Sequence, residues 1–331
     1  MNVAVTGVAG FIGSHTAEAL VARGHRVLGI DAFDDFLYAA KIKRSHARGL
    51  AARLPAKAFR LAEVDICDGP AIARELATEG IEVVCHLAAL AGVRPSIEDP
   101  KRYIRTNLDG TGAVLEACRN TGIDRVVFAS SSSVYGARGA GQDLTRVAAF
   151  REDDPCLRPA SPYAATKRAG ELLCSTYVDL FGLGISALRY FTVYGPRQRP
   201  DMAIHKFARA IRDGRPVVLF GDGSSRRDYT FIDDIVAGTV AAIERVTPAR
   251  FEIYNLGGTH TTSLAELVGA LEAGLGKRAI REHRPDQPGD VPLTFAAIDR
   301  AREDLAYEPK IQLADGIDAF VRWLSQDGDD R

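Results

Sequence analysis

The sequence has few cysteines, and their spacing does not indicate a cysteine-based site. The five are Cys67, Cys85, Cys118, Cys156 and Cys174, an odd number in which no two are closely spaced. This spacing excludes a zinc ribbon and disfavours a disulfide framework. We therefore expect reduced, buried or incidental thiols, as in a cytoplasmic protein.

The chain also lacks an excess of charge of either sign. Lysine and arginine number 42, aspartate and glutamate 43, and the formal net charge is −1. Nucleic acids and anionic membranes are bound through basic surfaces, so the composition favours neither as a partner. A small anionic substrate remains possible, because a few local arginines suffice to bind it.

Long apolar runs are missing as well. The N-terminus, MNVAVTG, carries no basic segment, and no apolar stretch is long enough for a bilayer. We expect neither a signal peptide nor a membrane span, and a cytoplasmic location. Hydrophobic residues still make up 46% of the 331 residues, which is enough for a substantial core in one large or two moderate domains.

The first part of the chain alternates apolar runs with amphipathic stretches. Strand-like runs lie at 2–6, 26–30, 59–64, 82–87, 125–129 and 185–190. Helix-like segments lie at 11–22, 69–79, 100–120 and 162–181. Strands that are apolar almost throughout and alternate with helices indicate a parallel sheet covered on both faces. The sequence therefore predicts an α/β, Rossmann-type, doubly wound parallel sheet.

The pattern changes after Tyr190. Turn-rich stretches at 194–200, 221–227 and 284–292 separate shorter elements, which indicates a smaller C-terminal lobe. We place a dinucleotide-binding domain at 1–190 and a mainly substrate-binding lobe at 191–331. The segment at about 228–257 ends in a further strand-like run and is expected to return to the first sheet.

Three regularly spaced glycines follow the first predicted strand. Gly7, Gly10 and Gly13, with Phe11 and Ile12 before the last, form G-x-x-G-x-x-G where a strand ends and a helix begins. Glycines there allow a tight turn and a close approach to a pyrophosphate, which the helix N-terminus faces with unpaired N–H groups. A purely structural turn is the alternative, but this context favours dinucleotide binding.

Two aspartates at predicted strand ends bear on the choice of cofactor. Asp31 ends the second strand, 18 residues after Gly13. A carboxylate there accepts hydrogen bonds from the adenosine ribose and repels a 2′-phosphate, and no arginine follows it directly, so NAD is favoured over NADP. Asp65, after the third strand, either reaches the adenine or simply forms a turn.

A tyrosine and a lysine four residues apart indicate hydride chemistry. Tyr163 and Lys167 lie on one face of a predicted helix. A nearby ammonium and a positively charged nicotinamide both favour the phenolate form of Tyr163, and Lys167 can also hold the nicotinamide ribose. The serine run 130–133, after the fifth strand, offers a hydroxyl partner. A chance surface pair is the alternative for Y-x-x-x-K, and the combined features disfavour it.

Six motifs together resemble the extended short-chain dehydrogenase/reductases of the sugar-nucleotide epimerase/dehydratase type. They are TGVAGFIG, HLAALAGVRPS, SSSSVYG, YAATK, RYFTVYGPRQRPDM and RRDYTFIDD, and they extend over nearly the whole chain. The resemblance implies that Tyr163 removes the proton of the sugar 4-hydroxyl while the C4 hydride goes to NAD, with Ser131 as hydroxyl partner. In an epimerase the 4-keto sugar then turns over and takes the hydride back on its other face. The cofactor-binding residues that the resemblance adds are Ile66, Leu87, Ala88 and Ala89.

Local departures from the family pattern separate its branches. Dehydratases carry an Asp-Glu pair before VYG and UDP-glucuronate decarboxylases typically a glutamate, whereas this chain has Ser132 and Ser133. Thr192 stands where many members have asparagine. AGVRPS, FTVYGP and RPDM are similar to the UDP-glucuronate 4-epimerase branch. The alternatives are 4-epimerisation of neutral UDP-glucose or UDP-N-acetylglucosamine, UDP-glucuronate decarboxylation, and a non-catalytic NAD-binding protein.

The epimerase interpretation gives roles to residues of the second lobe. Oxidation at C4 of UDP-glucuronate creates a β-keto acid that readily loses carbon dioxide, so the carboxylate must be held. Arg199 can hold it in a charge-assisted clamp, with Thr192 as a hydroxyl contact, although a surface arginine is the alternative. The resemblance implies further contacts to the UDP-sugar from Ser132, Ser133, Arg94, Val218, Phe220, Arg227 and Asp290.

The resemblance also implies an assembly. Relatives commonly form homodimers through a four-helix bundle, which here would use the helices near 100–120 and 162–181. Both segments carry apolar stripes. No grouping of residues indicates a metal site.

Overall fold

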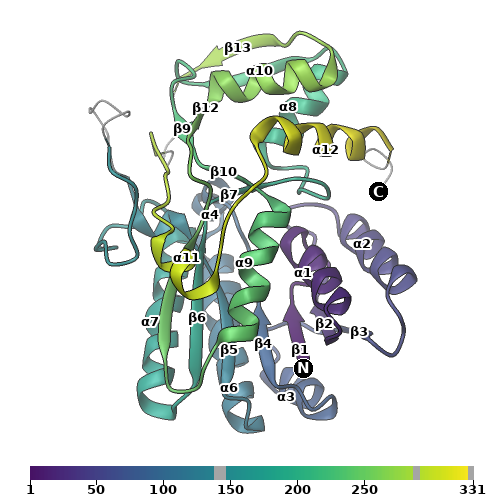
Figure 1. Ribbon diagram of the computed structural model, residues 1–331, viewed down its shortest axis with the longest axis vertical. Coiled ribbons are helices and arrows are strands. Elements are labelled where there is room, and N and C mark those ends of the chain that lie inside the picture. The colour runs from purple at the N-terminus through teal and green to yellow at the C-terminus, as the bar shows by residue number, and fades with distance from the viewer. Residues whose placement is uncertain (138–146, 286–290, 327–331) are drawn as a thin grey trace.

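The computed structural model describes residues 1–137, 147–285 and 291–326. In these residues seven strands form one sheet in the order β11-β6-β5-β4-β1-β2-β3, and every pairing in it is parallel. The strands are β1 Asn2–Thr6, β2 Arg26–Asp31, β3 Phe59–Glu63, β4 Val83–His86, β5 Arg125–Ser131, β6 Gly184–Tyr190 and β11 Phe251–Leu256. The predicted doubly wound sheet is confirmed (Figure 1).

Helices cover both faces of the sheet because successive strand residues point to opposite sides. Val3 and Val5 belong to one buried cluster and Ala4, between them, to another. The first cluster packs under α1 Phe11–Ala22, α2 Ala40–Arg53 and α9 Ile232–Arg245. The second packs under α3 Gly69–Thr78, α6 Gly110–Thr121 and α7 Pro162–Phe181.

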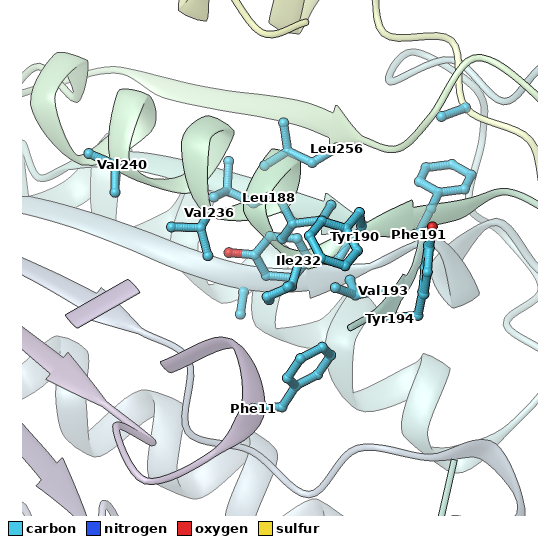
Figure 2. Close-up of a cluster of buried hydrophobic side chains, with 14 of the residues drawn as sticks. Phe11, Leu188, Tyr190, Phe191, Val193, Tyr194, Ile232, Val236, Val240 and Leu256 are labelled. Carbon is cyan, nitrogen blue, oxygen red and sulfur yellow. The ribbon is translucent and has the colours of Figure 1, made fainter. Parts of the chain in front are cut away.

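Helix α9 joins the later part of the chain to the core. Figure 2 shows Ile232, Val236 and Val240 along α9 beside Leu188 of β6 and Leu256 of β11. All five side chains are buried. The segment at about 228–257 therefore returns to the first sheet, where its last strand, β11, pairs with β6. The domain boundary at residue 190 stays a prediction.

The predicted helix at 100–120 is divided into three parts. It consists of α5 Pro100–Ile104, a π-helical turn η1 Arg105–Asp109, and α6. The widened turn contains Asn107, which is 2% exposed and bonds the backbone N and O of Leu90 at 2.8 and 2.9 Å. Single π-turns often lie at functional sites, and this one fixes the segment after β4. Helix α2 is not predicted by the sequence pattern, because only Ala47 and Leu50 of its residues are buried.

The C-terminal lobe lies over the carboxyl ends of the strands (Figure 1). Its strands β8 Pro216–Phe220 and β13 Ile280–Arg284 pair in parallel, next to α8 Ala203–Arg212, α10 Leu264–Leu275 and α12 Leu313–Gln326. Smaller elements connect it to the sheet: α4 Val93–Glu98, η2 Ser132–Tyr135, β7 Thr192–Tyr194, β9 Arg226–Arg227, β10 Tyr229–Phe231, β12 Thr262–Ser263 and α11 Asp299–Leu305. Across the described ranges, no helix is both long and apolar enough to cross a membrane.

A buried ion pair connects the sheet to α7. Arg189 of β6 donates from Nε and Nη2 to the two carboxylate oxygens of Glu171 at 2.8 and 2.9 Å, and their side chains are 1% and 0% exposed. Ser130 donates to Glu171 at 2.6 Å, and Arg189 donates to Tyr135 at 2.9 Å. This network fixes the end of β5, where the serine run begins, against the helix that carries Tyr163.

Replacing Arg189 by methionine should lower the free energy of unfolding by about 3–5 kcal/mol, because it leaves the buried Glu171 carboxylate without its main partner. Urea denaturation measures this loss. The control is Arg302→Met, which removes ion pairs with Asp299 and Glu308 from an arginine that is 46% exposed. That change should cost no more than about 0.5 kcal/mol. Equal losses for the two variants would contradict the structural role of the buried pair.

Candidate active site

A cavity of about 1220 Å³ lies at the carboxyl ends of the strands, under the C-terminal lobe. It is the position at which parallel α/β sheets bind ligands. Most of the site residues predicted from the sequence line it together: Gly7, Gly10, Phe11, Ile12, Gly13, Asp31, Asp65, Ile66, Leu87, Ala88, Ala89, Ser131, Ser132, Ser133, Tyr163, Lys167, Thr192, Arg199 and Arg227. Among the described residues, no group of three or more potential metal ligands occurs.

The glycine turn is packed so closely against the protein's own backbone that it cannot accommodate side chains. Gly7 has a φ of +71°, and a Cβ at Gly13 would lie 2.2 Å from the carbonyl oxygen of Gly7. A Cβ at Gly7 would lie 2.8 Å from the backbone N of Ala88. Helix α1 begins at Phe11. Its N-cap residue is Gly10, so no side chain caps the helix, and its first turn contains no acidic residue. The turn and helix end therefore fit a dinucleotide pyrophosphate.

Asp31 lies where a ribose-binding carboxylate is expected. It is 9% exposed, and its two oxygens accept hydrogen bonds from the backbone N–H groups of Ala9 (3.0 Å) and Phe33 (2.8 Å). These bonds fix the carboxylate and leave lone pairs for ribose hydroxyls. Burial raises the pKa of Asp31, and the two amide bonds oppose that rise.

Asp65 forms a turn and also lines the cavity. Its carboxylate accepts a hydrogen bond from the backbone N of Cys67 at 2.9 Å, which is an ordinary turn interaction. It also lines the cavity and lies 3.8 Å from the guanidinium of Arg105. The adenine contact stays a prediction.

Tyr163 and Ser131 meet in the cavity wall. A hydrogen bond with Ser131 and the positive charge of Arg199 lower the pKa of Tyr163, but burial outweighs both and the pKa is raised. The sequence assigns the lowering to Lys167 and to a positively charged nicotinamide. In the described residues it comes from Ser131 and Arg199, and Lys167 directs its ammonium to the backbone O of Ala129, at 2.7 Å.

Lys167 is held in a buried position one turn along α7 from Tyr163. It is 5% exposed, and its Nζ lies 5.1 Å from the centroid of the Phe128 ring. Burial lowers the pKa of Lys167 to about 8, while the negative charge of Glu171 acts in the opposite direction. The bond to Ala129 uses one of the three ammonium protons, so two remain for a ligand in the cavity.

The serines at 132 and 133 place hydroxyl groups where other branches of the family have acids. Ser133 donates from Oγ to Ser131 Oγ at 2.9 Å, and its backbone N donates to the same atom at 3.2 Å. Both serines line the cavity. Neither hydroxyl can act as a general acid or base near neutral pH, so the wall beside Tyr163 has no acid–base group at these two positions.

Arg199 reaches the cavity from the loop after β7. Its Nε and Nη2 donate to the two carboxylate oxygens of Asp201 at 3.0 and 2.7 Å, and Nη2 also donates to the backbone O of Ala91 at 3.1 Å. The side chain is 14% exposed, and Nη1 donates no hydrogen bond to the described residues. Thr192 lines the same cavity, with its backbone N bonded to the O of Asp228.

The remaining predicted substrate residues are not among the described residues that line the cavity. Arg94, on α4, packs its guanidinium over the Phe220 ring at 4.5 Å, and neither residue lines the cavity. Val218 lies on the same strand as Phe220, also outside the lining. Asp290 falls outside the described residues. The roles of these four residues stay predictions.

The structure adds residues that the sequence did not indicate. Tyr38, 9% exposed, lines the cavity, and burial raises its pKa while the charge of Arg199 opposes the rise. Tyr103 packs edge-on against Tyr163, with 6.2 Å between ring centroids. Asp201 belongs to the RPDM motif, so the sequence could have indicated it as a site residue. Tyr38 and Tyr103 belong to no recognised motif, and only the fold brings them to the site.

Fold and cavity together define a dinucleotide-dependent enzyme with a tyrosine–lysine pair beside its cofactor site. A model described as the NAD dependent epimerase/dehydratase family matches residues 3–257. The chain belongs to this family, which confirms the resemblance drawn from its motifs. Its cofactor is accordingly NAD, which the glycine turn and Asp31 fit.

Individual relatives are similar over their whole length. UDP-glucuronate 4-epimerase of Thermodesulfobacterium geofontis (strain OPF15) is 41% identical over 323 residues, covering 97% of this chain and 95% of that protein. UDP-glucuronic acid 4-epimerase from Bacillus cereus, solved with UDP-glucuronic acid and NAD, has a TM-score of 0.90 at 38% identity, covering 98% and 99% of the two chains. UDP-glucose 4-epimerase from Thermus thermophilus, solved with NAD, has a TM-score of 0.87 at 32% identity, covering 99% and 100%.

Substituting Gly13 by alanine should weaken NAD binding roughly tenfold or more, because the new methyl displaces the turn that faces the pyrophosphate, and lost charge-assisted bonds are worth about 1.5–3 kcal/mol. Calorimetric titration with NAD measures the affinity. The matched control is Gly269→Ala in α10, where an added Cβ meets nothing within 4 Å. Unchanged affinity in a folded Gly13→Ala protein would exclude the turn as the pyrophosphate site.

Proposed function

We propose that this chain is an NAD-dependent UDP-sugar 4-epimerase whose substrate is UDP-glucuronate, which it converts to UDP-galacturonate. The observation that carries the proposal is the position of Arg199, which lines the same cavity as Tyr163. A cation at that place can bind a carboxylate on the sugar while the tyrosine acts on C4. The relatives named above support the same reaction.

In the proposed mechanism Tyr163 is the base. Its phenolate takes the proton of the sugar 4-hydroxyl, and the Ser131 hydroxyl, already hydrogen-bonded to Tyr163, fixes the direction of that transfer. When bound, NAD accepts the C4 hydride and returns it. Lys167 keeps two ammonium protons for the cofactor ribose. Tyr163 gives the proton back when the hydride returns, so no net oxidation occurs.

The carboxylate of the substrate requires particular control during this cycle. With C4 oxidised, the sugar is a β-keto acid that loses carbon dioxide when the carboxylate bond aligns with the carbonyl π system. Arg199 can hold the carboxylate away from that alignment through Nη1, and Thr192 offers a hydroxyl from the same wall. Ser132 and Ser133 supply no acid or base for elimination, which disfavours dehydration.

A second candidate, 4-epimerisation of a neutral UDP-hexose, is favoured by one observation. The Asp201 carboxylate already pairs with two nitrogens of Arg199. This pairing reduces the net charge that the loop presents to the sugar. If it neutralises Arg199 fully, the cavity would accept a neutral sugar equally well.

Incubation of the enzyme with NAD and UDP-glucuronate, followed by separation of the products, tests the function. UDP-galacturonate should dominate, and Tyr163→Phe should lower its rate by about 100-fold or more, because general-base catalysis contributes about 10²–10⁴-fold. Dominant UDP-pentose with carbon dioxide release would defeat the proposal.

Arg199→Met distinguishes the two candidate substrates. Loss of a charged hydrogen bond is worth about 1.5–3 kcal/mol, so kcat/KM for UDP-glucuronate should fall roughly 10- to 100-fold while that for UDP-glucose changes little. Steady-state kinetics on both substrates provide the comparison. Equal losses on the two would favour the neutral substrate and assign Arg199 a structural role.

We further propose a cytoplasmic homodimer that pairs the helices near 100–120 and 162–181. Ile104, Leu172, Leu180 and Phe181 on these helices are large apolar residues that are 46–68% exposed. Such exposure on neighbouring helices is typical of an interface. The five cysteines are free, in keeping with a reducing compartment.

The dimer predicts a solution mass near twice the chain mass of 35.7 kDa. Light scattering coupled to gel filtration measures it. Leu172→Glu combined with Leu180→Glu should convert the protein to monomers, because buried unpaired charges disrupt an apolar interface. Glu substituted at Ile280, which is 57% exposed on β13, is the control and should leave the mass unchanged. A monomeric wild-type protein would refute the assembly.

A further inference from the structure

The loop at 195–202, between β7 and α8, carries Arg199 and contains a strained residue. Arg197 has a φ of +64°, in the left-handed region that residues other than glycine seldom adopt. A non-glycine residue held in this conformation requires surrounding contacts that impose it, and such residues gather at functional sites. Arg197 is not itself in the described lining of the cavity.

The side chain of Arg197 is bound to helix α1. Its Nη2 donates to the Glu18 carboxylate and to His15 Nδ1, the latter at 2.8 Å. Its guanidinium is 14% exposed. This is a nearly buried arginine whose partners belong to a different element of the fold, so it fixes the loop to the helix.

His15 secures the same loop through its other ring nitrogen. Burial and the charge of Arg197 lower the pKa of His15 to about 3, so the ring is neutral and carries one N–H. Nε2 lies 3.0 Å from the backbone O of Pro196, which can only accept, and 3.1 Å from Nε of Arg197. In the tautomer that carries the proton on Nε2, the ring donates to Pro196 and Nδ1 accepts from Arg197. Two consecutive loop residues are thus bound to one side chain of α1.

The connection from Arg197 to Arg199 is short and rigid. The intervening residue, Gln198, is 2% exposed and donates from Nε2 to the backbone O of Val193 at 3.0 Å. The backbone O of Gln198 is hydrogen-bonded to Nδ1 of the His205 ring at 2.8 Å. The backbone between the two arginines therefore cannot readily reorient, and a displacement of Arg197 carries over to Arg199.

Helix α1 is also the cofactor helix, since its N-terminus closes the glycine turn. His15 and Glu18, three residues apart on it, lie on one face. The loop that carries Arg199 is therefore attached to α1, the helix whose N-terminus faces the expected pyrophosphate site.

We propose that Arg197 is a positioning residue: anchored on His15 and Glu18 of α1, it aims Arg199 at the substrate carboxylate. The inference rests on the proposed function. It assigns the specificity for an acidic sugar to a contact outside the cavity, and it relates the strained backbone at 197 to that specificity.

Arg197→Gly tests the proposal, because glycine adopts the left-handed conformation without strain and only the anchor is lost. KM for UDP-glucuronate should rise roughly tenfold, while KM for UDP-glucose and the affinity for NAD stay within about twofold. Glu18→Gln should change the same constants in the same direction. Arg53→Ala is the matched control, since Arg53 binds the other oxygen of Glu18 from the surface and should leave KM unchanged.

A double-mutant cycle with Arg199→Met separates positioning from general destabilisation. If Arg197 acts through Arg199, Arg197→Gly adds no further loss once Arg199 is methionine. Additive losses, or equal KM increases for acidic and neutral sugars, would overturn the proposal. A wild-type enzyme that converts UDP-glucuronate while Arg197→Gly retains its KM refutes the positioning role alone. A wild-type enzyme that turns over only neutral sugars refutes the proposed function, and the positioning role with it.

Discussion

The guanidinium of Arg199 is the positive charge around which this active site is arranged. A nearly buried cation is unfavourable unless it is paired and hydrogen-bonded, and Asp201 and the backbone of Ala91 provide both. The same charge reaches Tyr163 and Tyr38, lowering the pKa of each against the effect of burial. Removing the charge would weaken the binding of an acidic substrate and raise the pKa of Tyr163 further.

The remaining structure brings that charge and the catalytic groups to one place. The parallel sheet carries the glycine turn, Asp31 and Ser131 to a common edge, and α7 adds Tyr163 and Lys167. The buried Glu171–Arg189 pair holds α7 to β6 behind the serines. The lobe closes the cavity from above and supplies the loop of Arg199. The chemical groups come from several elements, so the chemistry depends on the relative positions of those elements.

The sequence predicts this arrangement well where the pattern is local. Apolar strands, the glycine turn and the Y-x-x-x-K helix are all found where periodicity and motif place them. The π-turn around Asn107 is not predictable in this way, because the backbone of Leu90 that Asn107 bonds belongs to a separate segment. The contact of Arg199 with Ala91 and the attachment of Arg197 to α1 depend on packing between distant segments, which spacing does not encode.

In the proposed mechanism the hydride removed from C4 returns to C4 within one closed cavity, with no elimination and no decarboxylation. The most direct test uses UDP-glucuronate deuterated at C4 and follows the product by mass spectrometry and NMR. We expect UDP-galacturonate that retains the deuterium at C4, with no net accumulation of reduced cofactor. Loss of the label to solvent, or release of carbon dioxide with a UDP-pentose, would contradict it.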